Sequence, residues 1–297
     1  MGTKFITIII PTYGRNEYLQ RAIRSALNQS HRFFEIIIVD DNGYKTSQQK
    51  QNETIISQLG YNHIKYIVHD KNLGGSAARN SGIKNAKYDY IAFLDDDDVW
   101  LKDKLAKQVE IMSKSSESLG LVHTGFKIVD LKNKKKYIRL PSHYDNPTKK
   151  LLCKNYIGTT STIMCKRECL ESAGLFDESL PIRQDLDLYI RLSTICNFGL
   201  VNEILAIHFL HHNKKISQDV SGRIFAYDYF YKKYFHYFTS NRKEHALYLY
   251  KKGNFYLKHN NYHEARTNFS KAIHVNPFLI KSYSKYILSY LKKNDYE

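Results

Sequence analysis

The sequence predicts an α/β fold with a mostly parallel sheet flanked by helices, followed by a small all-α appendage. Short β-branched runs alternate with segments of helical spacing over residues 5–94, which is the pattern of a parallel sheet covered on both faces. Three of these runs end in polar clusters, at the position where such sheets bind ligands. Small and aromatic residues recur at helical offsets over residues 246–277. A chain of 297 residues has room for both parts.

Each predicted strand of the first part is a short apolar run closed by a turn signal or a polar cluster. The first run ends in Pro11-Thr12-Tyr13, and the second ends in Asp40-Asp41-Asn42-Gly43. Apolar residues three and four positions apart predict helices between the runs. The predicted strands are 5–10, 35–39, 64–68 and 90–94, and the predicted helices are 16–29, 46–59 and 74–86.

The pattern becomes mixed after Trp100. The lysine run 132–136 predicts a charged hairpin or loop, and residues 141–160 are predicted to form a loop. The remaining predictions are strands at 120–129 and 162–165 and helices at 101–112, 167–173 and 185–194.

Four consecutive aspartates, Asp95 to Asp98, follow the fourth predicted strand. Like charges this close repel, so a fold retains them where solvent or a cation relieves the repulsion. Alternate residues of an extended segment face the same side, so Asp95 and Asp97 are predicted to point together at one hard divalent ion. Asp96 and Asp98 then face elsewhere, or act after the chain turns. The alternative is a solvated acidic turn that caps the helix beginning near Trp100.

Six motifs in order along residues 4–217 resemble the family 2 glycosyltransferases, an inverting group with the Rossmann-like GT-A fold. They are Ile9-Ile10-Pro11-Thr12-Tyr13-Gly14-Arg15, Ile38-Val39-Asp40-Asp41-Asn42, Asn72-Leu73-Gly74-Gly75-Ser76-Ala77-Ala78-Arg79-Asn80, Phe93-Leu94-Asp95-Asp96-Asp97-Asp98-Val99-Trp100, Gly174-Leu175-Phe176-Asp177-Glu178 and Gln184-Asp185-Leu186-Asp187-Leu188.

The resemblance implies a donor site for a nucleotide-sugar, most simply a UDP-hexose or UDP-N-acetylhexosamine. Thr12, Tyr13 and Asp40 would hold the base and ribose. Asp41 would lie nearby, and Arg79 would either approach the diphosphate or pair with a neighbouring carboxylate. The wider set of implied donor-binding residues is Pro11, Thr12, Tyr13, Asp40, Asp41, Arg79, Asp95 and Asp96.

The same resemblance implies a divalent metal, Mn²⁺ or Mg²⁺, held by Asp95, Asp97 and Asp98. A late histidine of the family also contacts metal or diphosphate, and His211 matches it best. His208 and His212 are the competing candidates, because Phe209 replaces the arginine that commonly precedes this histidine. A solvent-exposed basic loop is the alternative for all three histidines.

The implied catalytic base is Asp185, which would deprotonate the acceptor hydroxyl. Gln184 stands where the family usually has glutamate, and Asp187 is interpreted as a structural residue at the start of a helix. The expected reaction moves a single sugar to a glycan or lipid-linked acceptor in surface polysaccharide biosynthesis, with residues 141–160 contributing to acceptor choice. A catalytically silent scaffold is the alternative, and Gln184 is the feature that favours it.

The net charge of +16 indicates anionic partners, but no nucleic-acid motif accompanies it, so nucleic acid is not an expected partner. Four cysteines without paired spacing predict reduced, mostly buried thiols. No apolar stretch approaches the length of a membrane span, and no secretory signal precedes the first strand. We therefore expect a cytoplasmic protein whose membrane contact, if it has any, is peripheral.

Three domains are predicted: 1–217 as the catalytic domain, 218–241 as an aromatic-rich basic linker helix, and 242–297 as a helical module resembling a tetratricopeptide repeat. Residues 223–238 include nine Phe or Tyr. These rings would either lie on an anionic membrane surface or fill an interdomain core. The C-terminal module would either dock a partner, including a second copy in a homodimer, or cap the enzyme.

Overall fold

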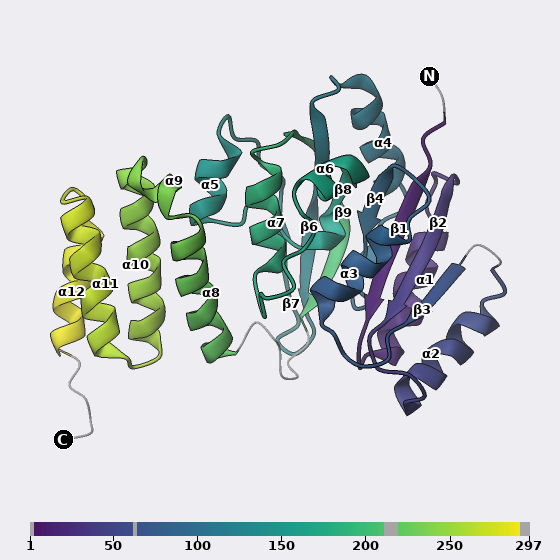
Figure 1. Cartoon of the computed structure of the whole chain (residues 1–297), viewed down its shortest axis with the longest axis horizontal. Coiled ribbons are helices and arrows are strands. Elements are labelled where there is room, and N and C mark those ends of the chain that lie inside the picture. The colour runs from purple at the N-terminus through teal and green to yellow at the C-terminus, as the bar shows by residue number, and fades with distance from the viewer. Residues whose placement is uncertain (1–2, 62–63, 211–218, 292–297) are drawn as a thin grey trace. The chain divides into compact units, whose positions relative to one another are not determined.

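The computed structural model describes residues 3–61, 64–210 and 219–291, which fall into two compact units (Figure 1). Unit 1 comprises Met1–Pro147 and Tyr156–Asp219, and unit 2 comprises Thr148–Asn155 and Val220–Glu297. The short segment 148–155 therefore belongs with the C-terminal helices, which the three-domain prediction did not include.

The first half of unit 1 is the predicted parallel sheet. β1 pairs with β2 and β4, and β2 pairs with β3, all in parallel. Pro11 is tolerated near the end of β1 because pairing with β4 already stops at Ile9, so its missing N–H leaves no ladder bond unmade on that side. The strands are β1 (Ile6–Thr12), β2 (Phe34–Asp40), β3 (Ile64–Val68) and β4 (Tyr90–Phe93).

Alternation along these strands supplies two apolar faces. Ile8 and Ile10 pack in the core that includes α1 and α4, whereas Ile37 and Val39 pack with α3 on the opposite face. The glycine at position 82 of α3 permits a close approach, because a Cβ there would lie 2.4 Å from Ile9 Cγ2. The helices are α1 (Asn16–Leu27), α2 (Ser47–Gln58), α3 (Gly75–Lys84) and α4 (Lys104–Lys114).

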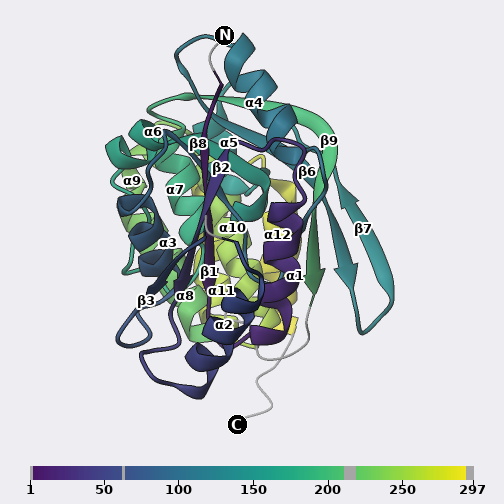
Figure 2. The same cartoon turned by 90° about the vertical axis from the view of Figure 1, so that its right-hand side faces the viewer.

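The second half of unit 1 makes the sheet mixed. The strand order is β3-β2-β1-β4-β8-β6-β9-β5, and β7 pairs with β6 as a hairpin (Figure 2). β8 is antiparallel to β4 and β6, while β9 runs parallel to β6. The strands are β5 (Val99–Trp100), β6 (Leu119–Asp130), β7 (Lys135–Arg139), β8 (Ile163–Lys166) and β9 (Asn197–Leu210).

The shorter elements of the second half correct one prediction. Residues 141–160 are not all loop, because α5 (Pro147–Cys153) forms there and buries Leu151 and Leu152. Its proline stands at the first helical position, where a missing N–H costs nothing. Helices α6 (Arg167–Ser172) and α7 (Gln184–Leu192) agree with the helices predicted at 167–173 and 185–194, whereas the short helix η1 (Thr160–Thr162) was not predicted.

Unit 2 is helical, and Figure 1 shows α10, α11 and α12 side by side. The rings of Tyr227, Phe230, Tyr234 and Phe238 are buried, and Phe238 packs against Tyr248 of α10. The helices are α8 (Val220–Lys233), α9 (Phe235–Thr239), α10 (Arg242–Lys258), α11 (Tyr262–Val275) and α12 (Ile280–Leu291). No helix within the described ranges is long and apolar enough to cross a membrane.

Candidate active site

The four aspartates form a tight turn after β4. The N–H of Asp98 donates to the carbonyl oxygen of Asp95 at 3.0 Å, so this segment is not extended. The extended segment on which the predicted alternation rested is therefore replaced by a turn. The turn distributes the carboxylates among three different sets of partners.

Asp96 and Asp97 meet the end of β1 and share one guanidinium. Asp96 accepts from Thr12 Oγ1 at 2.9 Å and from the N–H of Tyr13 at 3.3 Å. Arg15 Nη1 lies 3.3 Å from Asp96 and also pairs with Asp97. Burial raises the pKa of Asp96 to about 7, although Arg15 opposes the shift. The ring of Tyr13 remains 54% exposed beside this cluster.

Asp95 is held from the opposite side. Arg79 Nη2 donates to it at 2.6 Å, and Thr160 Oγ1 donates to the same oxygen at 3.1 Å. The N–H of Asp95 donates to Ser161 Oγ at 3.0 Å. Burial alone would raise the pKa of Asp95, but the guanidinium of Arg79 outweighs it and lowers that pKa below its ordinary value. The structure thus places Arg79 on a carboxylate, as one of the two alternatives predicted.

Asp98 faces β9, because β5 pairs with that strand through Val99 and Ile207. His208 Nδ1 lies 2.8 Å from Asp98 Oδ1. Burial by itself would lower the pKa of His208, but the carboxylates, Asp98 foremost, raise it above its ordinary value. Within the described residues, the buried Oδ2 of Asp98 has no hydrogen-bond partner. His211 and His212 lie outside the described residues.

Asp40 is fully buried, and both of its oxygens already accept hydrogen bonds. Asn42 donates to Oδ1 from its N–H at 2.9 Å and from its side chain at 2.8 Å. Asn52 and Tyr66 donate to Oδ2 at 2.8 and 2.6 Å. A nucleotide base contacting this carboxylate would have to share or replace one of these bonds.

Asp41 organises the loop before α3. Its carboxylate accepts from the N–H groups of Leu73 and Gly74 at 2.8 and 2.7 Å, and His69 Nδ1 lies at 2.7 Å. Gly74 has a φ of +94°, a conformation that suits glycine. Asp41 therefore sets the position of the segment that leads to Arg79.

Asp185 begins α7 and is partly buried. Burial raises its pKa, while the N–H of Leu186 and the guanidinium groups of Arg79 and Arg183 oppose the shift. Arg183 precedes the helix with φ +62°, a strained conformation for a residue with a side chain. Gln184 donates to the carbonyl oxygen of Leu180 at 2.9 Å, so its amide is used within the protein.

The acidic turn fits a divalent cation, judged by its donor set. Asp97 and Asp98 offer hard carboxylate oxygens, and Oδ2 of Asp98 is buried without a hydrogen-bond donor among the described residues. The part of the chain that the structure describes contains no ready-made group of three His, Cys, Asp or Glu ligands. Mg²⁺ commonly uses one or two protein carboxylates and completes its shell with substrate phosphates and water.

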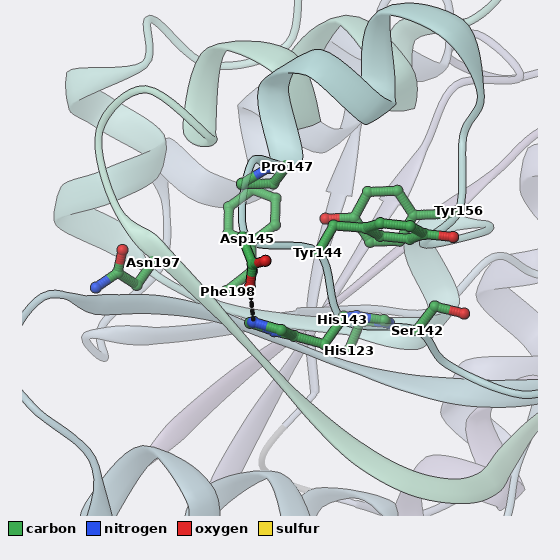
Figure 3. A pocket seen from close by; sticks show the side chains of 9 residues that line it. All are labelled: His123, Ser142, His143, Tyr144, Asp145, Pro147, Tyr156, Asn197 and Phe198. Atoms are coloured by element: carbon green, nitrogen blue, oxygen red, sulfur yellow. Dashed lines mark ion pairs between the residues drawn. The ribbon is translucent and has the colours of Figure 1, made fainter.

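A pocket of about 400 Å³ lies in unit 1 beside the 141–147 loop (Figure 3). The rings of Tyr144 and Tyr156 have centroids 4.6 Å apart, and His143 lies 3.9 Å from Asp145. The lining residues are His123, Ser142, His143, Tyr144, Asp145, Pro147, Tyr156, Asn197 and Phe198.

Arg139 ends β7, just before this loop. Burial lowers the pKa of Arg139, and the nearby Asp185 and Tyr144 oppose that shift.

Several residues that contact the acidic side chains lie outside the six motifs and were not predicted from the sequence. Thr160 and Ser161 reach Asp95 from η1, and Asn52 and Tyr66 reach Asp40 from α2 and β3. The one sequence feature that could have indicated these contacts was the cluster of hydroxyl residues at 159–161. Arg15 was part of the first motif without a role assigned to it.

Comparison with known proteins agrees with this architecture. The model of the family described as Glycosyl transferase family 2 matches residues 7–174. A putative teichuronic acid biosynthesis glycosyltransferase, TuaG of Bacillus subtilis, is 32% identical over 214 residues, covering 70% of this chain and 80% of TuaG.

Longer relatives match as well. An uncharacterized glycosyltransferase of Rickettsia conorii is 30% identical over 220 residues, which cover 71% of this chain. The matched region spans only 35% of that relative's own length.

Among solved structures, S. aureus TarS 1–349 in complex with UDP-GlcNAc aligns with a TM-score of 0.61 at 16% identity. The alignment covers 96% of this chain and 89% of that one, and at this identity it establishes the shared fold. The match to the family model and the relation to TuaG together show that this chain belongs to glycosyltransferase family 2 and has its GT-A fold.

Proposed function

We propose that this protein is an inverting glycosyltransferase that moves a single sugar from a nucleotide-sugar to an acceptor hydroxyl. The observation that carries the proposal is the arrangement around Arg79, which binds Asp95 of the acidic turn and interacts electrostatically with Asp185 of α7. Arg79 thus contacts a carboxylate of the acidic turn directly, and the nearby candidate base helps to raise the pKa of Arg79. Family membership supports the same reaction class.

The donor is proposed to be a UDP-sugar. Tyr13 presents an exposed ring that a nucleotide base could stack on, next to Pro11 and Thr12 at the end of β1. Asp40 and Asp41 would shape this base and ribose pocket through the loops they hold. The bound UDP-GlcNAc of the TarS structure supports this donor class.

Asp97 and Asp98 would hold a divalent ion, together with Asp95, and His208 would orient Asp98. Such an ion supplies neutralisation of the diphosphate charge as the nucleotide departs. Arg15 now pairs with Asp96 and Asp97 and would have to release Asp97 for this to occur. His211 is kept as a proposed ligand of the same ion.

Asp185 is proposed as the general base. The acceptor oxygen forms a bond to the anomeric carbon while the bond from that carbon to the diphosphate oxygen breaks. The acceptor proton passes to Asp185, and the nucleoside diphosphate leaves with the bonding electrons. A raised pKa suits a carboxylate that must accept a proton, and general bases contribute about 10²–10⁴-fold in rate.

The pocket beside the 141–147 loop is proposed to receive the acceptor. Aromatic faces pack on sugar rings, and His143, Asp145 and Asn197 supply polar groups that can fix hydroxyls. We propose a glycan or lipid-linked acceptor in surface polysaccharide biosynthesis, a role supported by the name of TuaG. An anionic membrane surface and a homodimer through the C-terminal helices are compatible with such an acceptor.

A silent scaffold is the second candidate, and the observation that favours it is Gln184. The neutral amide of Gln184 precedes Asp185 and donates a hydrogen bond to the carbonyl oxygen of Leu180. Donor turnover with Mn²⁺ or Mg²⁺ would separate this candidate from the enzyme.

Asp185→Asn tests the proposed base. We expect the variant to lose transfer by at least about 10²-fold while UDP binding stays within a few-fold, because the amide keeps the shape of the carboxylate without its basicity. A transfer assay beside calorimetry measures both quantities. Wild-type turnover in this variant would refute the assignment.

A thermal-shift panel of UDP-, GDP- and dTDP-sugars, each with and without Mn²⁺, tests the donor class. Only the UDP-sugars are expected to stabilise the protein, and more strongly with metal. A larger shift with GDP- or dTDP-sugars would redirect the proposal to that nucleotide.

A further inference from the structure

Helix α12 carries its apolar side chains on the outside. Ile280, Ile287 and Leu291 are 80%, 58% and 75% exposed. Ser282 and Ser289 of the same helix are fully buried against the rest of unit 2. A helix that packs on a core normally shows the reverse distribution.

The outward residues form one continuous stripe. Positions 280, 287 and 291 are seven and four residues apart, which places them on the same face of an α-helix. Tyr283 and Tyr290 are exposed along the edge of the stripe, and Phe278 is exposed just before the helix begins. Aromatic rings with a polar atom suit the boundary between hydrocarbon and water.

The surroundings of this stripe are strongly basic. Segments 148–155 and 220–297 together hold 17 Lys or Arg and 5 Asp or Glu, so unit 2 contributes +12 of the net charge of +16. Helix α12 contains Lys281 and Lys285 and no acidic residue. Arg266 of α11 lies 4.7 Å from the ring centroid of Tyr290.

The apolar stripe could contact a second copy of this chain or a lipid surface, and the positive charge of unit 2 decides between these two partners. A second copy of this chain would bring another basic unit against the first, which repels at low ionic strength. An anionic lipid surface attracts basic residues, each by about 1 kcal/mol near the surface, while its acyl region accepts the apolar stripe. The aromatic helix α8 offers less of such a surface, because Tyr227 and Phe230 are buried while Phe225 is exposed.

We propose that α12 docks unit 2 onto an anionic lipid bilayer, lying in the interface with Ile280, Ile287 and Leu291 toward the acyl chains. This interaction does not depend on the glycosyl transfer reaction. It would hold the protein at a surface where a lipid-linked acceptor is concentrated.

Vesicle co-sedimentation of the full chain tests the proposal. The probes are vesicles of phosphatidylcholine alone and vesicles with about 30% phosphatidylglycerol. We expect binding to the anionic vesicles only, and weaker binding as salt rises. The triple variant Ile280→Ser, Ile287→Ser, Leu291→Ser should bind about tenfold more weakly or worse, since bound apolar area is lost.

A matched control replaces three exposed apolar residues of unit 1, in Leu131→Ser, Ile138→Ser, Leu140→Ser. This control should bind vesicles like wild type. Circular dichroism should show both triple variants folded, because none of the six side chains is buried.

Three outcomes would overturn the proposal. One is undiminished vesicle binding by the α12 variant, and another is equal binding to vesicles without anionic lipid. The third is a wild-type dimer in light scattering that dissociates in the α12 variant while no vesicle binds, since a second copy would then cover the stripe.

Discussion

The acidic turn retains four adjacent aspartates because three basic side chains neutralise their carboxylates. Arg79 serves Asp95, Arg15 serves Asp96 and Asp97, and His208 serves Asp98. The Arg79 side chain is 13% exposed, so its ion pair is screened less by water than a surface pair.

Replacing Arg79 by methionine should therefore destabilise unit 1. The change leaves the Asp95 carboxylate in a mostly buried site without its cation, at a cost of up to about 3 kcal/mol. Urea unfolding measures the loss. In a double-mutant cycle with Asp95→Asn, the second substitution should recover part of it, and strictly additive losses would show that the pair is not coupled.

His123 is the second residue whose environment makes a measurable prediction. It lines the pocket of Figure 3 but is only 2% exposed, and its Nδ1 has no hydrogen-bond partner in the described part of the chain. Burial lowers the pKa of His123 to about 4, with the backbone of Ser142 partly opposing the shift.

The unfolded chain should thus bind a proton at position 123 at higher pH than the folded one. Stability from neutral His123 is complete above pH 6.5 and falls as pH drops toward 4, by roughly 3 kcal/mol in all. Unfolding free energies measured across this range should decline less in His123→Gln. The exposed His143→Gln is the control and should follow wild type; equal slopes in all three proteins would contradict the burial argument.

Helices and strands whose own residues form a clear pattern could be predicted from the sequence. Those that depend on contacts with residues far along the chain could not. Strands β1 to β4 are apolar runs closed by turn signals or polar clusters, so their existence follows from the sequence alone. Helix α5 was missed, although Leu151 and Leu152 are buried and segment 148–155 belongs to unit 2, whose other residues lie far along the chain. The 14-residue strand β9 was not predicted, although its pairing with β5 brings His208 to Asp98.

In the candidate active site, too, the position was predictable from the sequence and the contacts were not. The motif positions located the acidic cluster, but its turn conformation depends on a hydrogen bond between Asp95 and Asp98 that no spacing rule reports. Hydroxyl groups at Thr160 and Ser161 reach the turn across more than sixty positions. Contacts at that separation are properties of the folded sheet.

The pairing of α10 with α11 gives a prediction for these two helices. A Cβ on Gly253 would lie 2.7 to 3.1 Å from three ring carbons of Phe269, which is fully buried. Gly253→Ala should gain about 1 kcal/mol of helix propensity but lose about 1–3 kcal/mol to overpacking. We expect net destabilisation of unit 2.

Phe269→Leu is the matched partner substitution. It removes ring atoms that the new methyl group would meet, so the double variant should be more stable than the sum of the single losses predicts. Additive losses would mean that the two residues do not control this contact. The repeat-like identity of these helices remains a prediction, whereas the close approach is a property of the structure.

Over the whole chain, each unit buries a core of its own. The large core around Ile8, Leu19 and Leu105 belongs entirely to unit 1, and the core around Tyr256 and Phe269 belongs entirely to unit 2. The single tryptophan, Trp100, is buried in unit 1 and reports on that unit alone. Far-ultraviolet circular dichroism reports on both units, because both contain helices.

We expect unit 1 and unit 2 to unfold in separate transitions. A ligand should stabilise only the first, and a substitution in unit 2 should destabilise only the second. UDP-GlcNAc with Mn²⁺ at about 100 times its Kd should stabilise the Trp100 transition by about 2.7 kcal/mol, since the proposed donor site lies in unit 1. Gly253→Ala should lower only the unit 2 transition, which circular dichroism detects and Trp100 does not, and leave the tryptophan signal unchanged. If Gly253→Ala shifted both signals together, the units would unfold as one cooperative body, and the charge and apolar stripe of unit 2 could no longer be treated apart from the fold of unit 1.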